Sequence, residues 1–242
     1  GLSISPGPGE DRGLTWLYPD HKAPTIQMYD YKTPGNPGQG YLYTDNKVFG
    51  IQIGNNASAK AKDGSVSGIA IGDYSQSRAL GIGLGHYAQS EQIGAIAVGS
   101  AAKAKGFNSL AMMRQAYAGE QYAAAIGTAA SAQGKASLAM GHSALATGDQ
   151  SIAIGSANPN PKYDDKGTPY TAYDETTNTQ ANAARSVAIG QGAKSNTDDS
   201  IAMGTGANVA AGRNYKGENF THGIAIGSNA LSQGIQGVAI GN

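Results

Sequence analysis

Histidines and adjacent carboxylates are the residues of this chain whose chemistry could support a metal site or acid–base catalysis. The four histidines are His21, His86, His142 and His222. No two of them have the spacing of zinc ligands, and they fall in different parts of the sequence. The carboxylates that are adjacent in sequence are Asp164, Asp165, Asp198 and Asp199. Neighbouring side chains diverge, so we expect these pairs in exposed turns. We predict no metal, no cofactor and no catalytic residue, and therefore no enzyme.

A second chemical motif is the run Gly81-Ile82-Gly83-Leu84-Gly85, which imitates the glycine loop of a dinucleotide site. No helical pattern follows it, and its glycines fall on the columns of a longer repeat. The nine-residue repeat of calcium-binding rolls, with its Asp column, is also absent. A β-helical enzyme acting on polysaccharide would need carboxylates or Arg clustered on one stacked face, and the columns hold Ser, Gln, Lys and Ala instead.

The amino-acid composition excludes further classes of protein. The 242 residues include 36 Gly but only three Phe and one Trp, too few large side chains for a deep globular core. Lys plus Arg equals Asp plus Glu at 17 each, so no bulk charge attracts nucleic acid or an anionic membrane. No apolar run reaches the length of a membrane-spanning helix. The absence of Cys excludes disulfides. The first residues, Gly-Leu-Ser, lack Met and any basic, apolar leader, which suggests a processed or partial chain.

An internal repeat organises the sequence from residue 48 onward. Its phrase is Ala-x-Ile-Gly or a close variant, and the commonest distance between copies is 14 residues. The twelve closing positions are Gly54, Gly72, Gly85, Gly99, Met113, Gly127, Gly141, Gly155, Gly190, Gly204, Gly227 and Gly241. A fixed period predicts one structural unit per repeat, stacked on its neighbours.

Position-by-position columns predict two short strands in each repeat. Bulky apolar residues stand three and one before the closing position, with Ala between them in ten coils. Alternate strand residues face opposite sides, so this strand is apolar on both faces. A second strand follows, with small Ala or Ser residues on one face and polar residues on the other. The pattern predicts an all-β, parallel β-roll of about twelve 14-residue coils.

The orientation of the first strand determines what the roll exposes. We expect the bulky columns to pack inside against the small residues of the second strand, which leaves the middle Ala column outside. A continuous apolar stripe predicts association, because monomers seldom expose so large an apolar surface. The predicted interface residues are Ala70, Ala97, Ala111, Ala125, Ala139, Ala153, Ala188, Ala202, Ala225 and Ala239.

The phrase Ser-Val-Ala-Ile-Gly-Gln-Gly-Ala-Lys-Ser at residues 186–195 resembles the head repeats of trimeric autotransporter adhesins, typified by the Yersinia adhesin. The resemblance covers about residues 48–242 and implies a left-handed roll, a homotrimer and display on the outer membrane of a Gram-negative bacterium. It also implies a role in virulence through host matrix proteins (collagen, fibronectin, laminin) or host cell-adhesion receptors. Collar, stalk and membrane anchor do not follow before Asn242, so we expect a head fragment.

Three segments interrupt the repeat: a Pro- and Tyr-rich cap or tip at 1–47, and insertions at about 158–180 and 211–221. Within the cap, the run from Thr25 to Tyr29 alternates as a strand does. Loops on rigid scaffolds often carry function, and Tyr is a favoured anchor at interfaces. The candidate ligand-binding residues are Trp16, Tyr18, Tyr163, Asp164, Asp165, Tyr170, Tyr173, Arg213, Tyr215 and Lys216. The alternative is that the insertions only brace the subunits of a spacer or self-association module.

Overall fold

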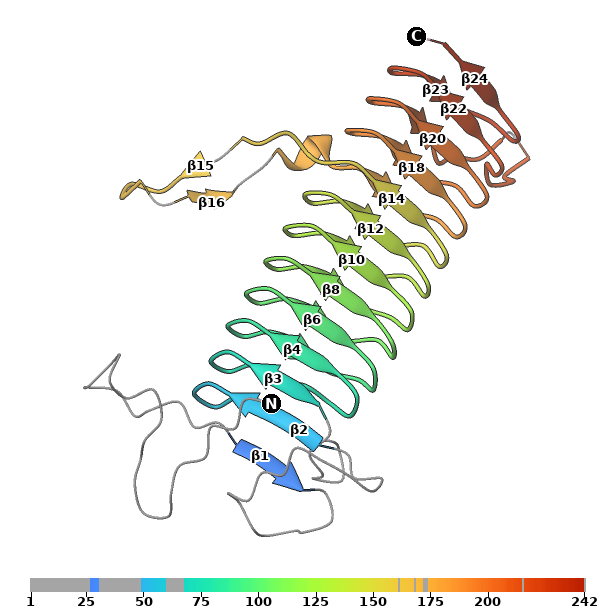
Figure 1. Cartoon of the computed structure of the whole chain (residues 1–242). Coiled ribbons are helices and arrows are strands. Elements are labelled where there is room, and N and C mark those ends of the chain that lie inside the picture. The colour runs from blue at the N-terminus through green and yellow to red at the C-terminus, as the bar shows by residue number, and fades with distance from the viewer. Residues whose placement is uncertain are drawn as a thin grey trace, which may run out of the picture.

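The chain forms a parallel β-solenoid of about twelve coils, as the repeat predicts (Figure 1). The computed structural model describes residues 27–30, 49–59, 68–160, 162–167, 169–171, 174–214 and 216–241. Most coils contain a three-residue strand, a first corner after the closing glycine, a two-residue strand and a second corner. None of the described residues belongs to a helix long and apolar enough to cross a membrane.

The first strands of the coils stack into one long sheet. Strand β1 (Gln27–Asp30) opens it, followed by β2 (Phe49–Ile53), β3 (Ile69–Ile71), β4 (Ile82–Leu84), β6 (Ile96–Val98), β8 (Leu110–Met112), β10 (Ala124–Ile126), β12 (Leu138–Met140), β14 (Ile152–Ile154), β18 (Val187–Ile189), β20 (Ile201–Met203), β22 (Ile224–Ile226) and β24 (Val238–Ile240). From β2 onward the pairing is parallel and in register, so that each apolar column of the sequence becomes a ladder. We call this the long sheet.

The second strands form a parallel sheet of nine strands, which we call the short sheet. Its members are β5 (Gln89–Ser90), β7 (Lys103–Ala104), β9 (Tyr117–Ala118), β11 (Ser131–Ala132), β13 (Leu145–Ala146), β17 (Gln180–Ala181), β19 (Lys194–Ser195), β21 (Asn208–Val209) and β23 (Leu231–Ser232). The two sheets face each other, form the two walls of the roll and enclose its interior.

Strand β1 confirms the prediction of a strand within residues 25–29, with a shift of its bounds. It pairs antiparallel with β2, so that Met28 lies opposite Ile51. The long sheet therefore begins with a strand that comes from outside the repeat. Most of residues 1–47 lies outside the described residues, and their role as a cap stays a prediction.

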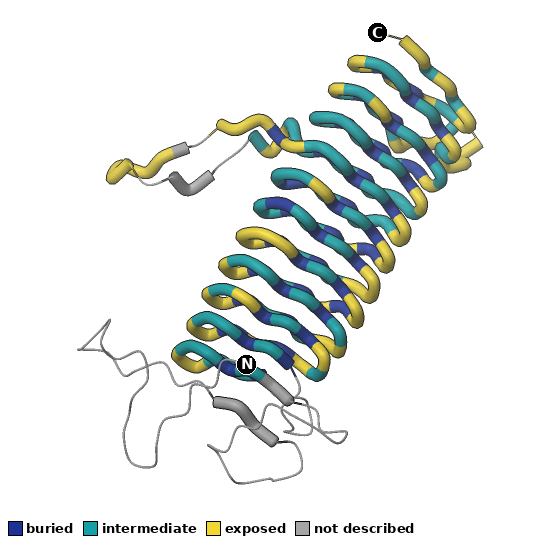
Figure 2. The backbone as a smooth tube through the Cα atoms, in the orientation of Figure 1, coloured by how far each residue is buried: buried dark blue, intermediate teal, exposed yellow. Residues whose placement is uncertain are grey.

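Burial contradicts the predicted orientation of the Ala column. The column faces the interior of the roll (Figure 2), and nine of its ten residues have no exposed surface. These nine are Ala70, Ala97, Ala111, Ala125, Ala139, Ala153, Ala188, Ala202 and Ala225. Ala239 is half-buried because no coil follows it. The prediction that these residues form an outward interface is therefore wrong.

The width of the coil explains this orientation. The residues that face the Ala column from the other side are small and fully buried as well. Ala118 and Ala132 lie on the short sheet, and Ala116 and Ala130 come directly before its strands. Small side chains fill the narrow space between the two sheets, and the largest that is fully buried is Val209. A close-packed interior leaves little room for extra methylenes. The bulky columns consequently point away from the roll, where most of their side chains are half-buried.

Serine hydroxyls fix the second corner from inside. Ser109, Ser137 and Ser186 each precede a strand of the long sheet and donate a 2.7 Å hydrogen bond to the carbonyl oxygen three residues earlier. Ser109 and Ser137 are fully buried. The local carbonyl supplies these hydroxyls with the partner that most buried polar groups have. The buried hydroxyl of Ser151, at the same position of the following coil, has no such partner.

Glycine closes the phrase because two corners approach closely. Gly127 has φ of 136°, and a Cβ atom there would lie 2.4 Å from the carbonyl oxygen of Gly141 in the next coil. Met113 takes the same place with φ of 87°, and its coil nevertheless keeps register with its neighbours. The departure at Met113 therefore leaves the roll intact.

An ion-pair ladder links three successive second corners. Arg185, Asp199 and His222 occupy equivalent positions there. The Arg185 guanidinium donates to both carboxylate oxygens of Asp199, at 2.5 and 2.8 Å, and the His222 Nε2 atom lies 3.7 Å from Asp199. Asp198 instead accepts a hydrogen bond from the Ala184 backbone. The adjacent carboxylates of this turn thus diverge, as expected.

Replacing Ala125 with Leu tests the inward orientation of the Ala column. The larger side chain would overpack the roll, and we expect the free energy of unfolding to fall by about 1–3 kcal/mol or more. Ala124→Leu is the matched control, since Ala124 points outward in register with Leu110 and Leu138. Urea denaturation followed by circular dichroism compares the two variants. Equal midpoints would contradict the assigned orientation.

The ion-pair ladder of Arg185, Asp199 and His222 predicts that the stability of the fold depends on pH. The hydrogen bond from Arg185 lowers the pKa of Asp199, and this effect outweighs partial desolvation, which acts in the opposite direction. The charge of Arg185, and that of His222 when it is protonated, lower the pKa further. Because the folded-state pKa is lowered, the stabilisation is present above the ordinary Asp pKa of about 4 and is lost as the pH falls below it toward the folded-state value.

Carbon-13 NMR titration of the Asp199 carboxyl measures this pKa directly. We expect Arg185→Gln to raise the titration midpoint toward the ordinary Asp value. Arg114→Gln removes an arginine from a different corner and should leave the midpoint in place. A midpoint that does not respond to Arg185→Gln would refute the ladder.

Candidate functional site

The larger insertion leaves the roll at a first corner. After β14 the chain forms an antiparallel hairpin of β15 (Lys162–Tyr163) and β16 (Pro169–Thr171), then the 3-10 helix η2 (Glu175–Thr177), and returns to the roll at β17. Figure 1 shows the hairpin projecting to one side of the rod. The coils before and after it still pair directly, with Ile152 opposite Val187.

The hairpin turn carries three of the candidate ligand-binding residues. Tyr163 is 57% exposed, and Asp164 and Asp165 are exposed beside it. The Asp164 side chain accepts a hydrogen bond from the Lys166 backbone at 3.0 Å, which shapes the turn. Tyr170 lies on β16, and nothing is described of its side chain. Tyr173 lies outside the described residues.

Hydrogen bonds fasten the base of this insertion to the roll. The Asn158 backbone donates to the Thr177 hydroxyl at 2.8 Å, and the Asp174 backbone donates to the Asn158 carbonyl at 2.9 Å. The Asn158 side chain also accepts a hydrogen bond from Gln191, which lies on the first corner of the following coil. The two ends of the insertion are therefore held together and against the roll.

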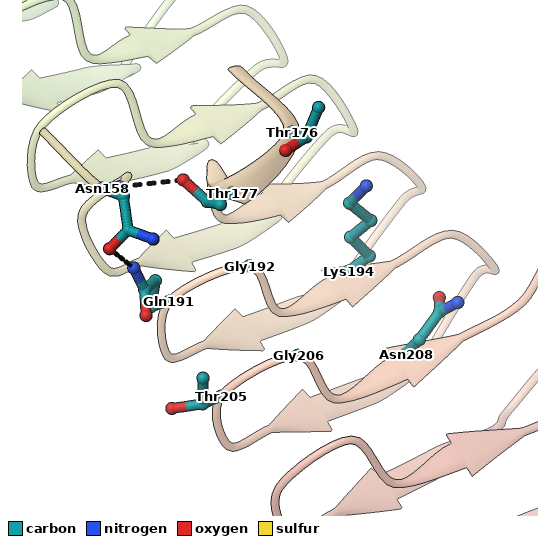
Figure 3. Close-up of a pocket in the computed structure, with 9 residues that line it drawn as sticks. All are labelled: Asn158, Thr176, Thr177, Gln191, Gly192, Lys194, Thr205, Gly206 and Asn208. Atoms are coloured by element: carbon teal, nitrogen blue, oxygen red, sulfur yellow. Dashed lines mark hydrogen bonds between the residues drawn. The ribbon is translucent and has the colours of Figure 1, made fainter. Parts of the chain in front are cut away.

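This base forms one wall of a polar pocket of about 310 Å³ (Figure 3). The short sheet contributes Lys194 and Asn208, and two successive first corners contribute Gln191 with Gly192 and Thr205 with Gly206. The insertion contributes Asn158, Thr176 and Thr177. In Figure 3 the bare backbone at Gly192 and Gly206 lies between the polar side chains of the corners and those of the sheet.

The chemistry of the pocket is one cation among neutral hydrogen-bonding groups. Its lining includes Lys194, three amide side chains and three threonines, and no carboxylate or aromatic ring. None of the ion pairs among the described residues involves Lys194. By contrast Lys103, at the equivalent place on β7, lies 3.0 Å from Glu91. The pocket can therefore accept an anionic group and several hydroxyls.

Sequence reasoning missed this pocket. Its walls come from an insertion and from two later coils, and only folding brings them together. One signal was available, namely that Gly192 and Gly206 occupy a corner position where other coils carry a side chain.

The second insertion forms a closed loop at the opposite, second corner. Arg213 donates from Nε to the Asn219 side chain at 3.0 Å, and the Asn214 and Glu218 side chains are 2.6 Å apart. The loop borders a cavity of about 360 Å³ whose lining includes Asp198, Arg213 and Phe220. Lys216 is exposed at its turn, and Tyr215 lies outside the described residues.

The structure thus separates the candidate residues into different places. The two insertions leave the roll at opposite corners, so Tyr163 and its neighbours do not share a site with Arg213 and Lys216 (Figure 1). Trp16 and Tyr18 lie outside the described residues.

An aromatic cluster near the beginning of the roll was also absent from the predicted set. Tyr74 and Tyr87 stack at 4.8 Å on successive first corners, with His86 edge-on to the Tyr87 ring. Their equivalent corner positions in the repeat could have revealed this pairing.

Comparison with known families agrees with this architecture. The YadA head domain repeat matches residues 90–112, 132–158, 177–207 and 221–242. The gaps after residues 158 and 207 coincide with the two insertions, whereas the gap at residues 113–131 lies within the regular coils. No curated protein matches the chain. Heads of this family have an adhesin-type function. The chain therefore belongs to the YadA head family, the heads of YadA-like trimeric autotransporter adhesins.

Proposed function

We propose that the protein is the head of a bacterial surface adhesin that holds host matrix proteins or host cell-adhesion receptors by polyvalent contacts, without enzymatic activity. The match to YadA head repeats carries this proposal. Collagen, fibronectin and laminin are the matrix proteins to test first. The head would be exposed at the outer membrane of a Gram-negative bacterium.

The apolar face of the long sheet supports assembly into a homotrimer. Its two outward columns consist of Ile, Leu, Val and Met in nearly every coil, and Met112, Met140 and Met203 are 38–41% exposed. A face this long and continuous exceeds the apolar patches that monomers leave in water. We place the subunit contacts on these bulky columns, which replace the Ala column of the sequence prediction, and the coils would be left-handed as in the family.

Such a trimer would leave the short sheet and both insertions available. The short sheet lies on the opposite side of the roll from the apolar face, so its polar surface would point away from the threefold axis (Figure 1). Three copies of each weak site on a stiff rod raise the effective concentration of the second and third contacts. Avidity could then exceed the affinity of a single site.

A spacer or self-association module is the second candidate function. The observation that favours it is the fastening of the first insertion, since the hydrogen bonds of Asn158, Asp174 and Thr177 are those of a brace. In this case the insertions would support the subunits and another domain would bind the host.

A charge on the apolar face tests the trimer. Ile154→Glu would bury three carboxylates near the axis without partners, and desolvation of unpaired charges is costly. We expect light scattering to report three times 24.5 kDa for the wild type and a loss of trimer for this variant. Ser131→Glu, on the outer surface of the short sheet, is the matched control and should stay trimeric. A wild-type monomer would overturn the proposal.

Shortening the hairpin separates the adhesin from the spacer. Replacing residues 160–172 with a short Gly-Ser linker removes Tyr163 and both carboxylates of the turn but keeps Asn158, Asp174 and Thr177. We expect the trimer and its melting temperature to persist and attachment to surfaces coated with collagen, fibronectin or laminin to decrease. Tyr163→Ala tests the exposed ring alone. Unchanged attachment of a destabilised variant would instead favour the spacer.

A further inference from the structure

We propose that the pocket beneath the first insertion binds a single acidic sugar residue, bearing a carboxylate or a sulfate, at the end of a host glycan. This inference rests on the proposed function and adds a ligand class and a place for it. The pocket is lined by the base of the insertion, by β19 and β21, and by the first corners at Gly192 and Gly206 (Figure 3).

The charge of the ligand follows from Lys194. Its ammonium group belongs to none of the ion pairs of the described residues, and no carboxylate lines the pocket. An amine in a half-buried setting without a partner favours an anion, and hydrogen bonds to charged groups contribute more than neutral ones. Lys103 shows that the same column of the short sheet can hold a paired lysine, because Glu91 lies 3.0 Å away there.

The remaining lining matches a polyhydroxylated ligand. Asn158, Gln191 and Asn208 offer amides, which can both donate and accept. The hydroxyls of Thr176 and Thr177 add acceptors, because both already donate their protons within the insertion. Ring hydroxyls need this mixture, whereas a bare phosphate or sulfate ion needs only donors. The volume of about 310 Å³ is at the lower limit of small-molecule pockets, which favours one sugar residue over a longer chain.

Gly192 keeps the pocket open, although the backbone conformation of this corner does not require a glycine there. It has φ of 67°, and the equivalent corner position in other coils carries side chains at similar φ, including Tyr87, Ala101, Ala129 and Ser143. The nearest atom to a Cβ built at Gly192 is the Thr177 carbonyl oxygen at 3.7 Å, an ordinary contact. A side chain is therefore sterically allowed by the protein, and its place would be the space of the pocket.

The pocket is preorganised. The Thr177 hydroxyl accepts from the Asn158 backbone and donates to the Asp174 carbonyl, both at 2.8 Å, and Gln191 is bonded to Asn158. Ligand binding would not have to order these groups, which reduces its entropic cost. In a trimer built on the apolar face, the pocket would open on the outer side in three copies.

Titration calorimetry and ligand-observed NMR on the purified protein test the inference. The probes are N-acetylneuraminic acid, glucuronic acid and N-acetylglucosamine 6-sulfate, compared with neutral glucose and N-acetylglucosamine, and with inorganic sulfate. We expect dissociation constants on the order of 1 mM for at least one acidic sugar, and binding about tenfold weaker or undetectable for its neutral counterpart.

Two variants and their matched controls locate the site. Lys194→Gln should abolish the preference for acidic sugars, whereas Lys103→Gln, in the same column but outside the pocket, should not. Gly192→Asn should fill the pocket and abolish all sugar binding, because Asn tolerates positive φ. Ala129→Asn makes the equivalent change on another first corner and should bind as the wild type. Circular dichroism confirms that each variant is folded.

Three results would overturn the inference: no binding of any acidic sugar, wild-type binding by Lys194→Gln or Gly192→Asn, or equal binding of inorganic sulfate and the sugars. Absence of sugar binding together with intact matrix attachment would contradict the sugar site and leave the adhesin proposal standing. Sugar binding by a head that attaches to no host surface would contradict the adhesin proposal and leave the sugar site standing.

Discussion

The narrow interior of the coil is the constraint on which the structure depends. A coil of about 14 residues brings two sheets so close that nearly all side chains between them are those of Ala, Ser or Thr, and the largest that is fully buried is Val209. The larger apolar side chains must then point outward, and the long sheet becomes a surface that water does not favour. One steric limit thus sets both the composition of the repeat and the need for a partner surface.

The sequence predicted the architecture well because its information is periodic. The spacing of the closing glycines, the parallel strands and the separation of apolar from polar columns are all local properties of the repeat. It did not predict the direction of the Ala column, since alternation in a strand apolar on both faces shows which residues share a face and not which face is inside. Side-chain volume decides that question: Ala125 fits where Ile126 does not.

The sequence predicted only part of the candidate site, and the reason differs from the one that applies to the Ala column. The hairpin residues Tyr163, Asp164 and Asp165 were recognisable as an exposed interruption, and the structure places them on the projecting turn. The pocket depends on contacts between Asn158, Thr177 and Gln191, which are 19 and 33 residues apart. No column of the repeat encodes such contacts. Gly192 and Gly206 were the local trace, and its meaning required the φ values of the other coils.

Interruptions are the parts of this fold that are free to acquire function. The long sheet continues past the first insertion without a break. Ile152 pairs with Val187 although the distance between the closing glycines has grown from 14 to 35 residues. An added segment therefore costs the roll little as long as it begins and ends on one corner. Its base, however, must be hydrogen-bonded to the neighbouring coils, and this requirement creates a fixed polar wall beside a regular sheet. A pocket at such a junction combines the rigidity of the solenoid with side chains that the repeat itself cannot provide.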